Sequence, residues 1–445
     1  MRLIAKTLTV FGLTIAVVAA LSMIRGTVHD RQRYRADAVA EVARSTAGAQ
    51  SLEGPALFVP FSDHVTTTQT DPGGVQRRIE EVKRGTWVFF PGTLEVHGEL
   101  RPVPRKRGLH EVRVFELEST QRATFRVQIP RDEDPSTPRT IGEPRLGVGI
   151  RDVRGLIGAP TLQVSGTPVE LRQGQGSGGN GLHATLATPV EGALLALEVE
   201  FRATIQGTET LSIVPLAEYN VISLESTWPH PQFHGEFLPR ARTIARDGFR
   251  ARWEVSSLAS SAQAQFRERM TGDPLGRALD SVSVSLVDPV NVYSKVDRAT
   301  KYGVLFVLLT FVTFAMVEFL RQLRLHPIQY GLVGCAVAIF FLLLLALSER
   351  VPFAIAYLVA SIACVALIGH YLGHVLGGWR RGTGFAAMLG TLYAALYGLL
   401  VSEDNAMVLG AGLLFLILAA IMIWTRKVDW YRGGMPTTPS PAPHD

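Results

Sequence analysis

The chain has 445 residues, 47% of them apolar, with a formal net charge of +5. That composition suits a soluble protein of two or three domains, but the apolar residues gather in long runs, which excludes a wholly soluble protein. The small charge is spread along the chain and gives no reason to expect nucleic-acid binding. The two cysteines, Cys335 and Cys364, both fall inside predicted membrane helices, so no disulfide framework or zinc site is expected.

The first candidate membrane segment is residues 7–24, TLTVFGLTIAVVAALSMI, which follow Arg2 and Lys6. We interpret residues 1–24 as an N-terminal transmembrane anchor, because the apolar run is longer than the core of a usual secretory leader. The alternative is a leader cleaved near Ala20-Leu21-Ser22, a small-x-small pattern. In either case the following segment ends outside the membrane.

Residues 25–300 contain no apolar run long enough to span a bilayer, so we predict an outer domain, periplasmic in a Gram-negative cell. Its early segment Asp37–Ala49 has Ala, Val and Glu at helical spacing. Apolar and polar residues then alternate between Gly and Pro breaks, a pattern typical of strands. The alternating runs are WVFFPGTLEVHGEL, HEVRVFELEST, ATFRVQI, PRLGVGIRDV, ALLALEVEFRATIQG, LSIVP and SVSVSLVDP. We predict a mainly antiparallel β-domain, sandwich-like or curved.

Two polar segments of this domain have little specific chemistry. The glycine-rich Gly174–Gly181 lacks the Lys-Ser/Thr of a phosphate loop, and Ser177 is not in a G-x-S-x-G elbow, so a flexible hairpin tip is favoured. In GIRDVRG, Asp152 lies between Arg151 and Arg154, which predicts an ordinary local ion pair.

The segment STWPHPQFHGEFLP concentrates aromatic residues, histidines and prolines, among them Trp228, Pro229, His230 and Phe233. His230 and His234 are four residues apart, but the prolines forbid a regular helix and no carboxylate completes a metal site. We therefore favour a rigid aromatic loop that packs on the sheet or meets a partner.

Five further apolar spans fill the last third, each long enough to cross a hydrocarbon core and expected to be helical, because backbone in lipid must satisfy its own hydrogen bonds. They are Tyr302–Leu320, Ile328–Leu347, Pro352–Tyr371, Thr383–Val401 and Ala406–Trp424. We predict that residues 301–425 form a five-helix transmembrane domain. Residues 426–445, of which 435–445 are rich in Pro and Thr, are predicted to be a disordered cytoplasmic tail. With the anchor, the prediction is a six-helix bundle.

The connections between these spans alternate in charge. One set is basic and the other mainly acidic, and lysine and arginine collect on the cytoplasmic side, so both termini are predicted to be cytoplasmic. The basic set is Arg321, Arg324, Arg380, Arg381, Arg426, Lys427 and Arg432, and the acidic set is Glu349, Glu403 and Asp404, beside Arg350.

Several membrane residues are candidates for function or packing. Glu318 is expected to reach the interface beside Arg321, with a proton relay as the alternative. His326, His370 and His374 lie at one predicted depth, as interfacial residues or, less favoured, a metal or heme site. Two stripes of small residues predict close helix contacts; they are Ala386, Gly390, Ala394 and Gly398 on one helix, and Ala356, Ala360 and Cys364 on another.

Where the chain enters the membrane again, Asp297, Arg298 and Lys301 cluster in VDRATKY. Asp297 and Lys301 are four residues apart in the order that suits a helix start. We expect either an interfacial anchor or a junction that fixes the orientation of the outer domain.

Four blocks give the chain a family resemblance: STWPHPQFHGEFLP, VDRATKYGVLF, RLHPIQYGLVG with His326 and Pro327, and LLLLALSE. Together with RADAV, GPALFVP, GIRDVRG and RKVDWY, they resemble, in order and over nearly the whole chain, the CreD family of bacterial inner-membrane proteins. The resemblance implies a cell-envelope integrity protein induced by a two-component system that senses envelope or nutrient stress. It implies no catalytic residue and no cofactor.

Three classes of function compete at this point. The first is a non-enzymatic envelope protein, embedded in the lipid bilayer, whose outer domain binds a periplasmic or envelope partner. The second is a transporter or channel, which a wet cavity at the bilayer midplane would favour. The third is a membrane-bound hydrolase, which a deep polar cleft with a histidine and a carboxylate would favour.

Overall fold

The protein is described by a computed structural model that covers residues 2–70, 76–108, 110–132, 137–176, 179–272, 278–286, 292–321, 326–375, 378–402 and 406–425. The tail 426–445 and the acidic connection at 403–405 lie outside these residues. The chain divides into two compact units, one of Met1–Gln32 with Val290–Asp445 and one of Arg33–Pro289. We call them the helical unit and the β unit and describe each by itself.

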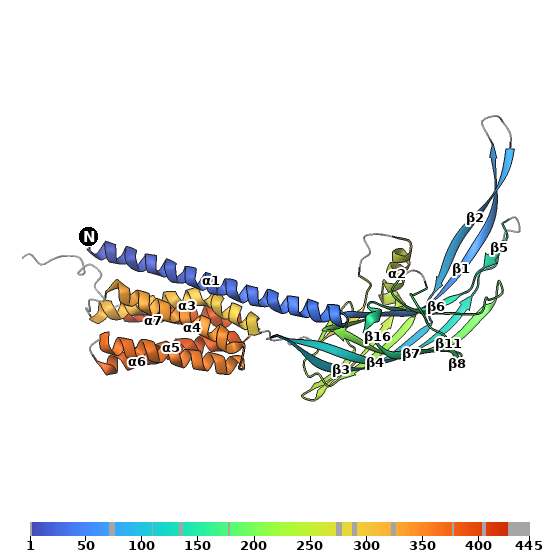
Figure 1. The fold of residues 1–445 in the computed structure, drawn as a ribbon. Coiled ribbons are helices and arrows are strands. Elements are labelled where there is room, and N and C mark those ends of the chain that lie inside the picture. The colour runs from blue at the N-terminus through green and yellow to red at the C-terminus, as the bar shows by residue number, and fades with distance from the viewer. Residues whose placement is uncertain are drawn as a thin grey trace, which may run out of the picture. The chain divides into compact units, whose positions relative to one another are not determined.

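The β unit contains two sheets (Figure 1). Sheet A has the order β14 (Gln232–Gly235), β17 (Val282–Ser285), β12 (Thr210–Val214), β1 (Gln50–Thr70), β6 (Arg145–Ile150), β10 (Gly181–Thr185), β9 (Arg172–Gln173), with β2 (Gln76–Phe89) and β5 (Arg139–Ile141) also paired to β1. Sheet B has the order β15 (Ala241–Ala245), β16 (Gly248–Ser256), β13 (Tyr219–Ser226), β3 (Thr93–Arg107), β4 (His110–Gln128), β11 (Leu194–Thr208), β7 (Leu156–Val164), β8 (Thr167–Val169). The β-rich domain is therefore confirmed, and parallel pairs occur at β1–β12 and β3–β13.

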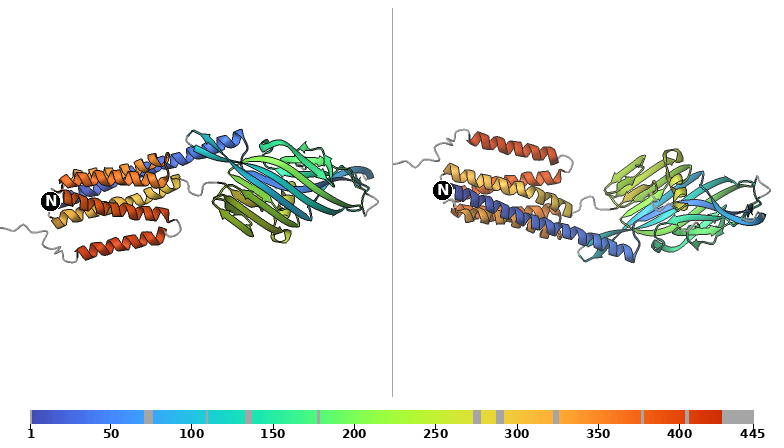
Figure 2. Two further views of the ribbon diagram at one scale, coloured as in Figure 1. Left: turned by 90° about the horizontal axis from the view of Figure 1, so that it is seen from below. Right: turned by 90° about the horizontal axis from the view of Figure 1, so that it is seen from above.

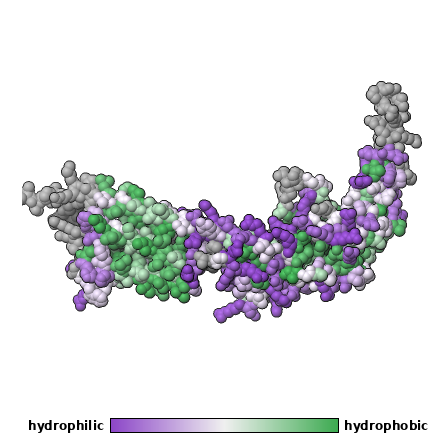
Figure 3. All heavy atoms as spheres, in the orientation of Figure 1, coloured by the Kyte–Doolittle hydropathy of each residue, from purple (hydrophilic) through white to green (hydrophobic). Residues whose placement is uncertain are grey.

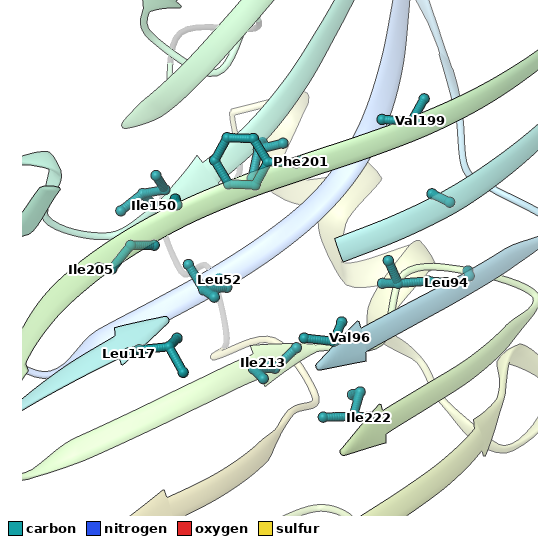
Figure 4. Close-up of a cluster of buried hydrophobic side chains, with 14 of the residues drawn as sticks. Leu52, Leu94, Val96, Leu117, Ile150, Val199, Phe201, Ile205, Ile213 and Ile222 are labelled. Atoms are coloured by element: carbon teal, nitrogen blue, oxygen red, sulfur yellow. The ribbon is translucent and has the colours of Figure 1, made fainter. Parts of the chain in front are cut away.

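One hydrophobic core joins the two sheets, because alternate residues of each strand point inward. Figure 4 shows Leu52, Ile150 and Ile213 of sheet A meeting Leu117 and Phe201 of sheet B. The short elements η1 (Val153–Gly155), η2 (Ser257–Ala259) and α2 (Ala262–Met270) complete the unit. Phe266 of α2 is buried against Phe58 in a smaller cluster beside the main core.

Strand β4 corrects one expectation from the sequence. HEVRVFELEST and ATFRVQI are not separate strands but parts of a continuous 19-residue strand. The polar residues Ser119 and Gln121 interrupt the apolar pattern, yet both occupy buried inward positions. The alternation is therefore preserved in the structure, although two of its inward side chains are polar.

The helical unit consists of α3 (Val292–Arg321), α4 (Pro327–Ser348), α5 (Phe353–Val375), α6 (Trp379–Val401), α7 (Ala406–Thr425) and the first part of α1 (Arg2–Ser45). Helices α3–α7, yellow to red, run alongside one another in both views of Figure 2. Helix α1 is continuous and includes both the predicted anchor and most of the segment predicted as a second helix.

Four helical stretches in the described residues are long and apolar enough to cross a membrane, namely Leu8–Ser45, Pro327–Ser348, Phe353–Val375 and Trp379–Val401. Large apolar side chains such as Leu332, Leu358 and Ile362 are exposed on their outer faces. Hydrophobic residues also dominate the visible surface of this unit in Figure 3. An apolar surface of this extent is typical of contact with lipid, so a membrane protein fits the structure.

The prediction that Ala386, Gly390, Ala394 and Gly398 form a packing face of α6 is wrong for the last three residues. A Cβ on Gly390 or Gly398 would have no neighbour within 4 Å in the described chain, and Ala394 is exposed. Ala386 does pack, because its Cβ lies 2.7 Å from the position of a Cβ on Gly369 of α5. Four residues turn a helix by about 400°, so a stripe of period four drifts by roughly 40° per step away from its partner.

The close contact between α5 and α6 lies instead at Gly382. A Cβ on Gly382 would come within 2.5 Å of Gly373 Cα and 2.7 Å of Gly369 O. Larger side chains of α6, among them Leu389 and Tyr393, continue the buried face. The second predicted stripe, Ala356, Ala360 and Cys364 on α5, is confirmed as buried.

Candidate functional site

The aromatic segment after β13 is packed into the β unit. Trp228 is 8% exposed, and its indole Nε1 donates to the carbonyl of His230 at 2.8 Å. The guanidinium of Arg113 lies 4.4 Å from the centre of the indole ring, a cation–π arrangement. The two prolines between Trp228 and Gln232 restrict the backbone, which suits a fixed loop.

The second half of the same segment also packs inward. Phe233 meets Phe249 and Trp253 edge to face, at centroid distances of 5.5 and 5.6 Å. Trp253 Nε1 donates to the carbonyl of Phe237 at 3.1 Å. Trp228 and Phe233 are therefore parts of the domain's interior, whereas His230 is exposed and Pro229 half-buried.

A hydrolase would be favoured by a histidine that contacts a carboxylate in a polar cleft. His234 Nε2 lies 2.7 Å from Ser285 Oγ, and Ser285 also contacts Thr210 Oγ1 at 2.8 Å. Among the residues described, no carboxylate contacts the His234 ring, and no group of three or more His, Cys, Asp or Glu could hold a metal ion. The pair thus lacks the orienting acid of a triad.

An open groove of about 740 Å³ on sheet B brings His97 near three glutamates. Arg101 binds both Glu99 and Glu118, at 2.9 and 2.8 Å, and Arg250 lies 3.4 Å from Glu225. These carboxylates are engaged by arginine on an exposed face, which is the usual arrangement of a solvated sheet.

A second cavity, of about 680 Å³, lies on sheet A between β1, β6, β12, the β9–β10 loop and α2. We call it the sheet-A cavity. Glu53 of β1 forms a two-point ion pair with Arg269 of α2, with Nη1–Oε1 at 3.0 Å. Arg269 donates these hydrogen bonds to the Glu53 carboxylate, and they raise the pKa of the Arg269 guanidinium above its ordinary value.

The β9–β10 loop forms one wall of this cavity. Gln175 is only 3% exposed, and its amide Nε2 lies 3.5 Å from Glu53 Oε2. The loop approaches β6 closely, because a Cβ on Gly147 would lie 1.9 Å from the carbonyl oxygen of Gln175. The glycines of LGVGI therefore provide space for the loop. A flexible hairpin tip is thus wrong for Gln175; Ser177 lies outside the described residues.

In the helical unit, Asp297 joins α1 to α3. Its carboxylate binds Arg25 Nε at 3.0 Å and Lys301 Nζ at 2.9 Å, so the predicted pair with Lys301 is formed. Burial alone raises the pKa of Asp297, but hydrogen bonds from Lys301 and Arg25 outweigh burial and hold it below its ordinary value.

A second ion-pair node lies at the end of α4. Glu349 binds Arg31 of α1, with Nε–Oε1 at 3.3 Å, and accepts a hydrogen bond from Tyr293 of α3 at 3.4 Å. The sequence blocks VDRATKY and LALSE thus both supply acids that bind arginines of α1.

Comparisons with known proteins identify the family of this chain. A family model described as inner membrane protein CreD matches residues 2–431. The inner membrane protein CreD of Escherichia coli K12 is 33% identical over 435 residues, which cover 97% of this chain and 94% of that protein. The chain belongs to the CreD family. A solved M1 zinc metallopeptidase of Deinococcus radiodurans, 9% identical with a TM-score of 0.23 over 44% of this chain and 42% of its own, is too dissimilar to inform the fold.

Other polar residues of this CreD chain have structural partners. Glu318 accepts a hydrogen bond from the buried Tyr330 of α4 at 2.8 Å, so it contacts the bundle interior; the side chain of Arg321 lies outside the described part. His326 and Pro327 begin α4, where His326 Nδ1 accepts from the amide of Ile328. Arg298 is half-buried on α3.

The rings of His370 and His374 meet edge to face near the end of α5, with centroids 4.8 Å apart, beside a cavity of about 510 Å³. Both histidines are exposed, and small residues such as Gly369 and Gly382 line much of the cavity. His326 is not among the residues that line it. This arrangement does not bring the three predicted histidines together as ligands.

Sequence reasoning missed Arg25, Arg31, Glu53 and Arg269. Each arginine meets a carboxylate that is far away in the sequence, and no local spacing indicates such a pair. The only available signal was the density of arginine just after the first apolar span, in RGTVHDRQRYR.

The Asp297 node gives a pH-dependent prediction. Asp297→Asn should lower the free energy of unfolding by roughly 1.5–3 kcal/mol at neutral pH, because hydrogen bonds to a charged group are lost. The pKa of Asp297 is lower in the folded protein than in the unfolded chain, where it is about 3.9. The carboxylate therefore contributes its full stabilisation at pH values above the unfolded-state pKa, and this stabilisation is lost as the pH falls through the folded-state pKa.

The difference in the free energy of unfolding between the parent protein and Asp297→Asn should therefore become smaller at acidic pH. Thermal unfolding of detergent-solubilised protein between about pH 3 and 7 measures this. Glu80→Gln, at an exposed position of β2, is the control and should leave the curve unchanged. A difference that persists unchanged at the acidic end would contradict an electrostatic role.

Proposed function

We propose that this protein supports cell-envelope integrity or the response to envelope stress without being an enzyme. In this proposal the β unit lies in the periplasm and binds an envelope protein or ligand, and six helices hold the chain in the inner membrane with both termini in the cytoplasm. Membership of the CreD family, whose members are named inner membrane proteins, supports the location.

The observation that carries the non-enzymatic proposal is the placement of the family blocks. Trp228 and Phe233 contribute to the interior of the β unit, while Asp297 and Glu349 join helices. In this proposal these residues stabilise the two units, and the surface of the β unit binds the partner. The charge alternation of the short connections supports the proposed orientation.

Reporter fusions test the topology. Fusions after Ala49 and Glu403 should report the periplasm, and fusions after Arg324 and Arg381 the cytoplasm, because lysine and arginine are retained inside. A reversed signal at any two of these positions would contradict the six-helix arrangement. An N-terminal leader that is cleaved would be seen as a shortened mature chain.

Complementation tests the function. In cells whose envelope phenotype depends on this protein, the full chain should restore the phenotype, whereas a chain without residues 50–290 should insert but not restore it. Protein levels are matched by blotting. Restoration by the shortened chain would contradict the proposal and favour a transporter. Loss of restoration by well-folded His234→Ala or Ser285→Ala would instead favour a hydrolase.

A further inference from the structure

The sheet-A cavity has the composition of a small-molecule site. Its volume of about 680 Å³ lies within the range of pockets that bind small ligands, roughly 300–1,000 Å³. It is formed by five separate parts of the β unit, namely the outer face of sheet A, the residue that follows β6, the β9–β10 loop, α2 and the segment just before β17. Such convergence of distant segments on one hollow is typical of a binding site.

Hydroxyl and amide groups form the polar part of its lining. Ser51, Ser212 and Ser281 belong to the lining, and Ser212 and Ser281 both contact Ser283, at 2.8 and 3.3 Å between oxygens. Gln175 and Asn180 add side-chain amides from the loop. A hydroxyl can donate and accept at the same time, as can an amide, so this lining suits a ligand with several hydroxyl groups.

Other residues of the lining are apolar. Phe266, Met270 and Leu279 are among them, and Phe266 is held in place by Phe58 and Phe90. A sugar presents hydroxyl groups at its edge and C–H groups on its faces. A cavity whose lining contains both polar and apolar groups therefore matches such a ring better than it matches a wholly apolar molecule.

The charges of the lining leave one positive charge. Arg269 is neutralised by Glu53 within the cavity. Arg151 also lines it, and Asp152 next to it is bound to Arg154, with Nη2–Oδ2 at 2.6 Å. No ion pair of Arg151 occurs in the described part of the chain. A single uncompensated guanidinium favours a ligand with one negative charge over a phosphate monoester, which carries about −1.5 to −2.

We propose that the sheet-A cavity binds a small polyhydroxylated carboxylate, that is, a sugar acid, with Arg151 holding the carboxylate. The serine hydroxyls and the amides of Gln175 and Asn180 bind the hydroxyl groups, and the Glu53–Arg269 pair keeps α2 over the site. This inference does not depend on the proposed envelope role, because purified protein is sufficient to test it.

Calorimetric titration of the full chain in detergent micelles tests the proposal with three probes. D-glucuronate carries both features, D-glucose lacks the carboxylate, and acetate lacks the hydroxyl groups. D-glucuronate should bind at least about tenfold more tightly than either, since a charge-assisted hydrogen bond and several neutral ones act together.

Two variants locate the binding. Arg151→Gln should remove the preference for D-glucuronate over D-glucose, while Ser212→Ala should weaken both sugars by a similar factor. Arg172→Gln changes an exposed arginine on β9 outside the cavity and should bind as the parent does. No titratable heat with D-glucuronate at millimolar concentration, or an unchanged preference in a folded Arg151→Gln protein, would overturn the proposal.

Discussion

Replacing Trp228 with alanine is expected to destabilise the β unit by about 3–5 kcal/mol, the range for removal of a large buried aromatic side chain. The indole is 8% exposed, belongs to the main core, and packs beneath the guanidinium of Arg113. The substitution also removes the hydrogen bond to His230 that closes the proline-rich turn. Cavity, cation–π and hydrogen-bond losses add in the same direction.

The measurement is chemical unfolding of the full chain, followed by tryptophan fluorescence and circular dichroism. Leu258→Ala is the matched control, because Leu258 is 97% exposed and its removal leaves no cavity. A Trp228→Ala protein as stable as the control would mean that the segment is a surface loop. If Trp228→Ala is destabilised as expected, loss of function in this variant would report a folding defect. A substitution of the exposed His230 is therefore the better test of partner binding.

Gly382→Leu is expected to disrupt the contact between α5 and α6. Even the first side-chain carbon would meet backbone atoms of Gly369 and Gly373, which cannot move aside as a flexible side chain can. Overpacking costs roughly 1–3 kcal/mol in general, and a clash with backbone lies at the upper end or beyond. We expect a lower thermal unfolding midpoint, or protein that is inserted but degraded.

Gly390→Leu provides the control on the same helix. A Cβ at Gly390 has no described neighbour within 4 Å, so leucine there should be accommodated at the helix surface. Both variants are compared in the same detergent by the loss of the folded protein's peak in size-exclusion chromatography after heating. Equal midpoints for the two variants would contradict the assignment of Gly382 to the helix contact.

The sequence predicted elements well where a pattern is local. Long apolar runs predict spanning helices because the bilayer fixes their length, and strict alternation predicts strands because one face of a sheet is buried. Helix α4, strand β11 and the ion pair of Asp297 with Lys301 all followed from such patterns. The aromatic loop at Trp228 was also recognised as packed.

The predictions failed where the outcome depends on distant neighbours. The stripe from Ala386 to Gly398 has the right composition, but the helix turns its later residues away from α5, and the close backbone approach to that helix lies at Gly382 and Ala386. The glycine-rich loop was expected to be a free hairpin tip, yet Gly147 and Gly149 allow Gln175 to pack on β6. Neither result can be obtained from spacing within one segment.

The sequence alone thus determined the class of protein, because the hydrophobic effect and backbone hydrogen bonding act on local pattern and length. It also determined the family, through blocks that occur along nearly the whole chain. Only the tertiary structure decided which charges pair and which residues line the sheet-A cavity. Arg269 meets Glu53 across 216 positions, and contacts of that kind depend on how strands and helices pack rather than on any local preference.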